Sequence, residues 1–345
     1  KGLKVHAVAS KLSIGNEKLK SNFICVAPGN EVAGLAGLTL TEKSVILVGE
    51  RAAETAGLLS AVAGLASRSN AKLAWIPRRA GERGALEAGA LGNLLPGGRP
   101  VSDAAARVDI AAAWGVNSLP TTPGRTATQI IDSLASGDLD AVVVGGVDVH
   151  DLPAGRKALD AFKKSFVISL EIAPSAITAV ADVVLPVAAI TEKSGSFLNW
   201  EGRARAFDEA VIDSHHRSDV RILSMIADAM GESIMLGTVT AAAREFNQLG
   251  KWDGARAQFA PVSSVAAKSV SGTEAILTSW RRLLDMGTLQ KGEDNLAGTR
   301  RPTVAVISPK RADAIGVATG QQVRVSNAHG SITIPVLVED IHEDA

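Results

Sequence analysis

The chain has 345 residues, of which 46% are hydrophobic, and its 36 basic and 36 acidic side chains balance to a formal net charge of zero. This length and composition predict a globular protein of roughly two or three domains and exclude an intrinsically disordered chain. No apolar run reaches the roughly 18 residues of a membrane span, and a neutral chain gives no reason to expect nucleic-acid binding.

The N-terminus has neither the apolar core nor the cleavage site of a signal peptide, and it lacks a starting Met, which suggests a segment of a longer chain. Cys25 is the single cysteine. A lone thiol excludes an intramolecular disulfide, and it excludes an all-cysteine iron–sulfur cluster within these residues because such a cluster needs about four thiolates. Cys25 lies in the apolar run FICVAP, which predicts a small buried side chain.

The first part of the chain alternates strands and a helix. Short apolar runs predict strands at 4–9, 23–27, 44–48 and 71–76, and helical spacing of Ala, Leu and Val predicts a helix at 51–67. This alternation favours a parallel sheet covered by helices. Gly57 and Gly64 would let that helix pack closely on the sheet. The glycine motifs of dinucleotide-binding folds and of P-loops occur nowhere in the chain, so the sequence does not support either interpretation.

A glycine-rich stretch follows at 78–98 and predicts either a flexible loop or a backbone that approaches a ligand closely. Arg78, Arg79 and Arg83 would suit an anionic ligand. Glu82 lies among them, and its carboxylate would repel a pyrophosphate.

The middle of the chain predicts helices and a strongly buried strand. Asp103 can cap a helix that runs to Trp114. Further helices are predicted at 126–136, 154–164 and 174–180, with strands at 141–144 and 166–170. The strand 141–144 is followed by GGVDVHD, in which His150 is either a turn residue or a proton relay.

The stretch 181–203 reads ADVVLPVAAITEKSGSFLNWEGR. Its strand should end at Pro186, because proline cannot donate to a ladder, and a polar loop is expected at 192–196. Ligands bind at the carboxyl ends of strands in open α/β sheets. The charged side chains here form either an acid/base cluster or a set of ion pairs that pins the loop, and ion pairs are the more usual role of charged turns: Glu192, Lys193, Glu201 and Arg203.

The rest of the chain predicts two helices at 219–230 and 239–249, a linker at 251–268, a helix at 273–286 and a domain boundary at 287–300. Short strands follow from 302, with a hairpin turn at 327–330. The domains expected are therefore residues 1–218, a helical segment and linker at 219–300, and residues 301–345. The six histidines include the neighbours His215 and His216 but no HExxH, so no metal site is expected.

The runs ADVVLP, E-K-x-G and N-x-E-G-R in 181–203 resemble the signature of the molybdopterin oxidoreductase family. Their version here is most similar to the large iron–sulfur subunits found in the peripheral arm of bacterial NADH-quinone oxidoreductase, or respiratory complex I. The glycine pattern at 84–97 and the run from Ser308 to Val325 resemble further parts of the same family. The resemblance implies an α/β fold: a parallel-sheet molybdopterin oxidoreductase-like domain, a helical connection, and the start of a small C-terminal β-barrel.

The resemblance also implies what this segment does. In the family, the turn after the 141–144 strand usually contains Asn-Pro and receives the nucleotide end of the cofactor, whereas Val147 and Asp148 stand here. We therefore expect a non-catalytic structural segment with no molybdenum, no pterin and no catalytic, cofactor-binding or metal-binding residue of its own. Iron–sulfur clusters of the 4Fe–4S and 2Fe–2S types are expected in an N-terminal part of the same polypeptide outside this segment.

The expected partners are other peripheral-arm subunits, at the cytoplasmic side of the bacterial plasma membrane, with no nucleic acid and no direct membrane insertion. Trp200 and Trp280 are the best candidates for burial against those neighbours, although core packing is the other interpretation of each. Two alternatives are an active molybdenum enzyme, such as a formate dehydrogenase catalytic subunit, and a free-standing α/β nucleotide-binding protein.

Overall fold

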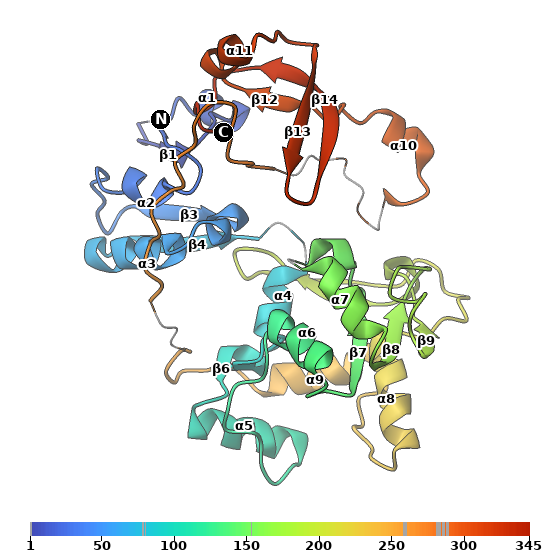
Figure 1. The fold of residues 1–345 in the computed structure, drawn as a ribbon. Helices are drawn as coiled ribbons and strands as arrows, with labels where there is room; N and C mark the ends of the chain where they lie inside the picture. The colour runs from blue at the N-terminus through green and yellow to red at the C-terminus, as the bar shows by residue number, and fades with distance from the viewer. Residues whose placement is uncertain are drawn as a thin grey trace. The chain divides into compact units, whose positions relative to one another are not determined.

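The computed structural model describes residues 2–77, 79, 81–152, 154–257, 261–280, 284, 287 and 290–345. The chain folds as two compact units, Lys1–Ile76 with Ala260–Ala345, and Pro77–Phe259 (Figure 1). Each unit combines helices with small parallel sheets, so the α/β class expected from the sequence is confirmed. The domain limits after residues 218 and 300 stay a prediction.

The first unit begins with two parallel strand pairs, β1 with β2 and β3 with β4. All four strands lie where the sequence predicts them. The elements are β1 (His6–Ala9), α1 (Ile14–Lys18), β2 (Asn22–Cys25), α2 (Glu31–Gly34), β3 (Val45–Gly49), a 3-10 turn (Glu50–Glu54), α3 (Leu58–Ser69) and β4 (Lys72–Ile76). Helix α3 packs Leu58 and Val62 against Val48 of β3, which makes the small core of this region.

The helix predicted at 51–67 begins only at Leu58. Gly57 adopts the left-handed conformation, with φ of 77°, and this breaks the 3-10 turn from α3. A Cβ on Gly57 would lie 2.5 Å from the backbone nitrogen of Ser264, so a close approach of two chain segments requires glycine here. The predicted close packing of the helix on the sheet is therefore wrong for both glycines, since Ser264 is not part of a strand and a Cβ on Gly64 would meet only the Arg68 side chain.

The C-terminal part of the first unit is a three-stranded open sheet in the order β12–β14–β13. Strand β12 runs parallel to β14, while β13 and β14 form the predicted hairpin, in which Asn327 pairs with Gly330. The described residues of 301–345 therefore make the start of a barrel and not a closed one. The elements are α10 (Asp294–Gly298), which lies within the predicted boundary segment, β12 (Ala305–Ile307), α11 (Pro309–Ile315), β13 (Gln322–Asn327) and β14 (Gly330–Val338).

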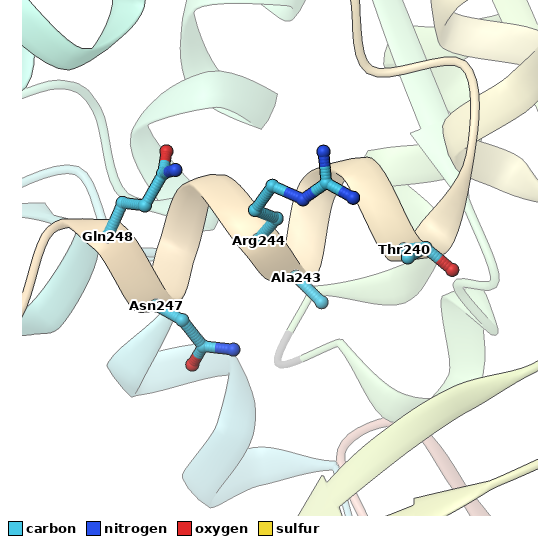
Figure 2. A pocket seen from close by; sticks show the side chains of 5 residues that line it. All are labelled: Thr240, Ala243, Arg244, Asn247 and Gln248. Atoms are coloured by element: carbon cyan, nitrogen blue, oxygen red, sulfur yellow. The ribbon is translucent and has the colours of Figure 1, made fainter.

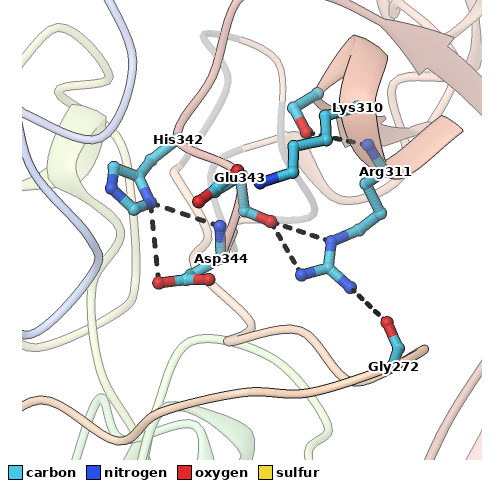
Figure 3. Close-up of polar contacts among 7 residues, drawn as sticks. Gly272, Lys310, Arg311, His342, Glu343 and Asp344 are labelled. Carbon is cyan, nitrogen blue, oxygen red and sulfur yellow. Dashed lines mark hydrogen bonds and ion pairs between the residues drawn. The ribbon is translucent and has the colours of Figure 1, made fainter. Parts of the chain in front are cut away.

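The sequence predicts a helix at 273–286. The structure describes residues 273–280 and 284 of that range, and none of them is helical, so the prediction is wrong for these residues. Arg311 of α11 explains this, because its guanidinium donates to the Glu343 carbonyl at 2.7 and 2.9 Å and to carbonyls of the segment 272–274 (Figure 3). The chain end is also tied to the start of the unit, since the N–H of His342 donates to the Ser10 carbonyl at 2.8 Å.

The second unit is built on a parallel sheet in the order β7–β8–β9. Helices α6 and α7 cover one face, where the core includes Val144, Phe162 and Val167 (Figure 1). On the other face α8 packs Ile222 against Leu170. The elements are α6 (Ala127–Ser136), β7 (Ala141–Gly145), a 3-10 turn (Val149–Asp151), α7 (Gly155–Phe162), β8 (Phe166–Glu171), β9 (Val183–Pro186), a 3-10 turn (Ile190–Glu192) and α8 (Asp219–Ala229).

The prediction that strand β7 is strongly buried holds for one face only. Val143 projects away from the face that α6 and α7 cover and is 55% exposed. The helix predicted at 174–180 is a series of turns. The Ser175 hydroxyl accepts the N–H groups of Ile177 and Thr178 as a helix cap does, but the N–H of Asp182 already donates to Val167 of β8, so the chain has turned towards β9.

Two further elements of the second unit lie in stretches expected to be loops. Helix α4 (Glu82–Glu87) forms inside the glycine-rich stretch. A hairpin of β10 (Gly195–Leu198) and β11 (Ala204–Phe207) begins inside the polar loop predicted at 192–196. The remaining elements are β5 (Leu94–Leu95), a 3-10 turn (Pro96–Gly98), β6 (Arg99–Pro100), α5 (Ala104–Trp114) and α9 (Val239–Gln248). Among the described residues, no helix is both long and apolar enough to cross a membrane.

Candidate functional site

The loop after strand β9 is held by the carboxylate of Glu192. This group accepts the N–H of Ala189 at 2.8 Å and the Ser214 hydroxyl at 2.8 Å, and it lies 2.9 Å from Nδ1 of His216. The Ala189 N–H, followed by the His216 and Ser214 contacts, lowers the pKa of Glu192 to about 2. Glu192 thus stays ionised and links the loop to the segment that precedes α8.

The four charged residues singled out in this stretch do not form one acid/base cluster. Lys193 pairs with Asp219 at 2.5 Å, in the first turn of α8. Arg203 pairs with Glu201 at 3.2 Å, and both side chains are exposed. The interpretation as ion pairs that pin the loop fits this geometry better than an acid/base cluster does, because each charge is engaged with a different partner.

The arginines of the glycine-rich stretch are engaged with carboxylates of this chain. Arg79 lies 2.5 Å from Asp151, and Arg83 lies 2.5 Å from Glu87 one turn along α4. Arg78, the third arginine of the predicted anion site, lies outside the described residues. Two of the three predicted phosphate contacts therefore serve internal ion pairs.

The turn after strand β7 also uses its carboxylates internally. Oδ1 of Asp148 accepts the main-chain N–H of His150 at 2.9 Å and caps the 3-10 turn. His150 is thus a turn residue that a local cap positions. Asp148 stands where the family resemblance puts the nucleotide end of the cofactor, and a carboxylate at that point does not fit a phosphate-rich group.

Two glycines of the 78–98 stretch, Gly89 and Gly92, bring main chain against main chain. A Cβ on Gly89 would lie 2.6 Å from the carbonyl carbon of Leu95, and one on Gly92 would lie 2.5 Å from the carbonyl oxygen of Gly124. The N–H of Gly124 donates to the Gly92 carbonyl, which fixes this contact. Gly89 and Gly92 are therefore explained by contacts within the chain itself.

Arg99 is a buried charge that sequence patterns alone do not reveal. Its side chain is 2% exposed, lies 3.3 Å from Asp109 and donates to the carbonyls of Pro96 and Leu249 at 3.2 and 2.8 Å. Its guanidinium also lies 5.4 Å from the ring centroid of Trp252. Nothing in the run GGRP marks this arginine, because its partners come from distant parts of the chain.

A hollow of about 450 Å³ lies along α9 and is lined by exposed side chains of that helix: Thr240, Ala243, Arg244, Asn247 and Gln248 (Figure 2). Arg244 is the sole ionisable group among these lining residues. The set holds neither a nucleophile with a base nor a pair of carboxylates, so it offers no recognisable catalytic arrangement.

The single cysteine is exposed, which corrects the prediction of a buried side chain. Cys25 is the last residue of β2, a strand that pairs with β1 alone among the described residues. Partial burial, and secondarily Asp340, raise the pKa of its thiol, which disfavours a reactive thiolate. Across the part of the chain that the structure describes, no three His, Cys, Asp or Glu side chains gather as metal ligands would.

Comparisons with known proteins agree with the resemblance seen in the sequence. The molybdopterin oxidoreductase family model matches residues 7–229, and the model of the molydopterin dinucleotide binding domain matches residues 276–345. The G subunit of NADH-quinone oxidoreductase from Mycobacterium tuberculosis is 46% identical over 98% of this chain, and that of Streptomyces coelicolor is 42% identical over 99%.

In both cases the match covers 43% of the relative, so the chain spans less than half the length of these proteins. Formate dehydrogenase H of Escherichia coli is 33% identical over 43% of this chain and 21% of that protein. One family model matches most of the chain, and both the α/β fold and the similarity to subunits of NADH-quinone oxidoreductase are consistent with that match. The chain therefore belongs to the molybdopterin oxidoreductase family.

Proposed function

We propose that this chain is a non-catalytic, structural part of the G subunit of an NADH-quinone oxidoreductase. The observation that carries the proposal is the extent of similarity. The G subunits of that enzyme match 98–99% of the chain at 42–46% identity, whereas formate dehydrogenase H matches 43% of it. The likeness to this molybdopterin-family enzyme is thus confined to part of the chain, while the likeness to the G subunits runs through both units.

The geometry of the Gly145–Asp151 turn supports the absence of catalysis. Asp148 caps the turn and Asp151 pairs with Arg79, so both carboxylates of this turn are engaged within the chain. A polyphosphate would need donors at this point. We therefore assign no catalytic, cofactor-binding or metal-binding residue to this segment.

In the assembled enzyme, NADH would be oxidised on another subunit and electrons would pass through iron–sulfur clusters towards quinone. Those clusters, of the 4Fe–4S and 2Fe–2S types, would lie in the same polypeptide but outside these 345 residues. The segment would bind neighbouring peripheral-arm subunits at the cytoplasmic face of the bacterial plasma membrane. It would neither insert into the bilayer nor bind nucleic acid.

The test is to tag the protein in its own organism and to purify it from solubilised membranes. We expect it to co-purify with NADH-quinone oxidoreductase activity and to contain no stoichiometric molybdenum or tungsten by elemental analysis. Deletion of residues 1–345 should leave NADH oxidation by the isolated flavin module intact and prevent assembly of the complete enzyme. Recovery of the protein as a stable monomer, or with bound molybdenum, would refute the proposal.

The runner-up is a catalytic subunit of a molybdenum enzyme, which the formate dehydrogenase H match favours. It predicts formate-dependent reduction of a dye by the purified protein. The proposal predicts no such activity, even after growth with added molybdate.

A further inference from the structure

Methionine is concentrated at one place in this chain. Three of the four methionines, Met225, Met230 and Met235, lie within eleven residues, on helix α8 and in the segment that follows it. Their exposed fractions are 48%, 75% and 84%. The fourth, Met286, lies outside the described residues. Methionine usually fills gaps in a hydrophobic core, so three exposed methionines in one stretch need another explanation.

The main chain around Met230 is held by the end of α8. The N–H of Met230 donates to the carbonyls of Ile226 and Ala227, both at 3.0 Å, and the N–H of Glu232 donates to the Ala227 carbonyl at 2.9 Å. The apolar contacts of α8 with the sheet are made by Ile222 and Ile226. A change in the chemistry of the Met230 side chain therefore leaves the end of the helix in place.

Met235 lies in the segment 232–237, which contains neither helix nor strand. Its backbone adopts the left-handed conformation, with φ of 51°, which is uncommon for a residue with a side chain. Exposed loops are the places where other enzymes reach a folded chain most readily. Met235 is thus open both to small oxidants and to an enzyme that would repair it.

We propose that Met230 and Met235 form a site of reversible oxidation, at which hydroperoxides convert the thioethers to methionine sulfoxide. The sulfur lone pair attacks one oxygen of the peroxide, so that a sulfur–oxygen bond forms and the oxygen–oxygen bond breaks. The departing oxygen takes the remaining proton and, for hydrogen peroxide, leaves as water. Sulfur loses two electrons and the peroxide gains the same two. Methionine sulfoxide reductases reverse the step: a dithiol is oxidised to a disulfide, and the sulfoxide oxygen leaves as water.

The fold tolerates oxidation at these two positions. A sulfoxide is polar, and it disrupts a core when the methionine is packed there. Side chains that are 75% and 84% exposed meet mainly water, which solvates the sulfoxide oxygen. The site therefore consumes oxidant without unfolding the protein.

Cys25 is a second kind of exposed sulfur, and its chemistry differs. Partial burial raises the pKa of its thiol, and the thiolate is the form that reacts with peroxide. Oxidation of Cys25 should therefore become faster as the pH rises. A thioether has no proton to lose, so the oxidation rates of Met230 and Met235 should not change between about pH 6 and pH 8.

The first experiment treats the full-length protein, purified from its own organism, with hydrogen peroxide and follows each methionine by peptide mass spectrometry. Met230 and Met235 should each gain one oxygen at least about twice as fast as Met225, whose side chain is less exposed and lies on a helix. Methionine sulfoxide reductases specific for the two sulfoxide epimers should then remove the added oxygen. Equal or faster oxidation of Met225, or sulfoxide that the reductases leave in place, would overturn the proposal.

The second experiment tests tolerance and occurrence in the cell. Met230→Gln and Met235→Gln place a polar side chain where the sulfoxide would be, and each should keep the thermal midpoint of the wild type within about 2 °C. Ile222→Gln, at a buried position of the same helix, is the control and should lower the midpoint by at least about 5 °C. Wild-type protein from cells exposed to hydrogen peroxide should carry sulfoxide at Met230 and Met235. Its absence there, or glutamine variants as unstable as Ile222→Gln, would contradict the proposal.

Discussion

Arg99 is the residue whose removal should cost the second unit most. Its buried guanidinium joins the β6 region, α5 and the end of α9 through Pro96, Asp109 and Leu249. Arg99→Ala would leave two carbonyls without a donor and a cavity beside Trp252. We expect a loss of about 3 kcal/mol in unfolding free energy, measured by urea denaturation.

The matched control for that change is Asp109→Asn. Asp109 is 47% exposed, so water can replace part of what it contributes, and asparagine keeps an oxygen for the Arg99 Nε. The expected loss is about 1 kcal/mol or less. An Arg99→Ala variant as stable as Asp109→Asn would show that the buried contacts of the guanidinium are not important for folding.

Glu192 gives the second unit a predictable response to acid. Its pKa falls from 4.5 to about 2 on folding, chiefly because its carboxylate accepts the Ala189 N–H. The ionised form therefore stabilises the folded state above pH 4.5, and this contribution disappears as the pH falls from 4.5 through 2. Glu192→Gln should remove this part of the stability change between pH 5 and pH 3, measured by urea unfolding at each pH.

Glu209→Gln, an exposed carboxylate just after β11, controls for the loss of one surface charge. If Glu192→Gln and Glu209→Gln show the same pH dependence of unfolding, the hydrogen bonds of Glu192 do not hold the loop as described.

At the scale of elements, α3 offers a paired test of why a helix begins where it does. Gly57→Ala forces a side chain into the left-handed conformation and towards the Ser264 backbone, so it should cost at least about 1–3 kcal/mol. Gly64→Ala in the same helix meets only the flexible end of Arg68 and should stabilise the protein by about 0.5–1 kcal/mol. Thermal unfolding of both variants measures the difference, and the opposite order would contradict this account of α3.

At the scale of the whole molecule, the two units should differ in their ability to fold from one continuous piece of chain. The second unit is continuous, Pro77–Phe259, and contains its own sheet and core. The first unit joins both ends of the chain, with His342 bonded to Ser10 and Lys11 bridged to Ile341. A fragment of residues 77–259 should unfold cooperatively by circular dichroism.

A fragment of residues 1–76 should fold only when residues 260–345 are supplied. Amide hydrogen exchange would detect this, because β1 and β2 amides should become protected only in the mixture. Protection of these strands in the 1–76 fragment alone would show that the contacts with the C-terminal segment are dispensable.

The sequence by itself determined the elements whose signals are local. Asp103 and Thr126 start helices because their side chains accept N–H groups of the next turn. Pro186 ends β9 because it has no N–H to donate. The hairpin turn at 327–330 follows from its Asn and Gly. The family was also readable, because its signature lies in one continuous stretch, 181–203.

The tertiary structure alone decided the features that depend on distant partners. The segment 273–280 is not helical because Arg311 and the C-terminal residues take its main-chain groups, and α3 starts late because Ser264 passes beside Gly57. Arg99 is buried by residues up to 150 positions away, whereas Cys25 is exposed although it lies in an apolar run. The intrinsic helix propensities of ordinary residues differ by less than about 1 kcal/mol per residue. Contacts between distant parts of the chain therefore decide the local structure where they oppose these propensities.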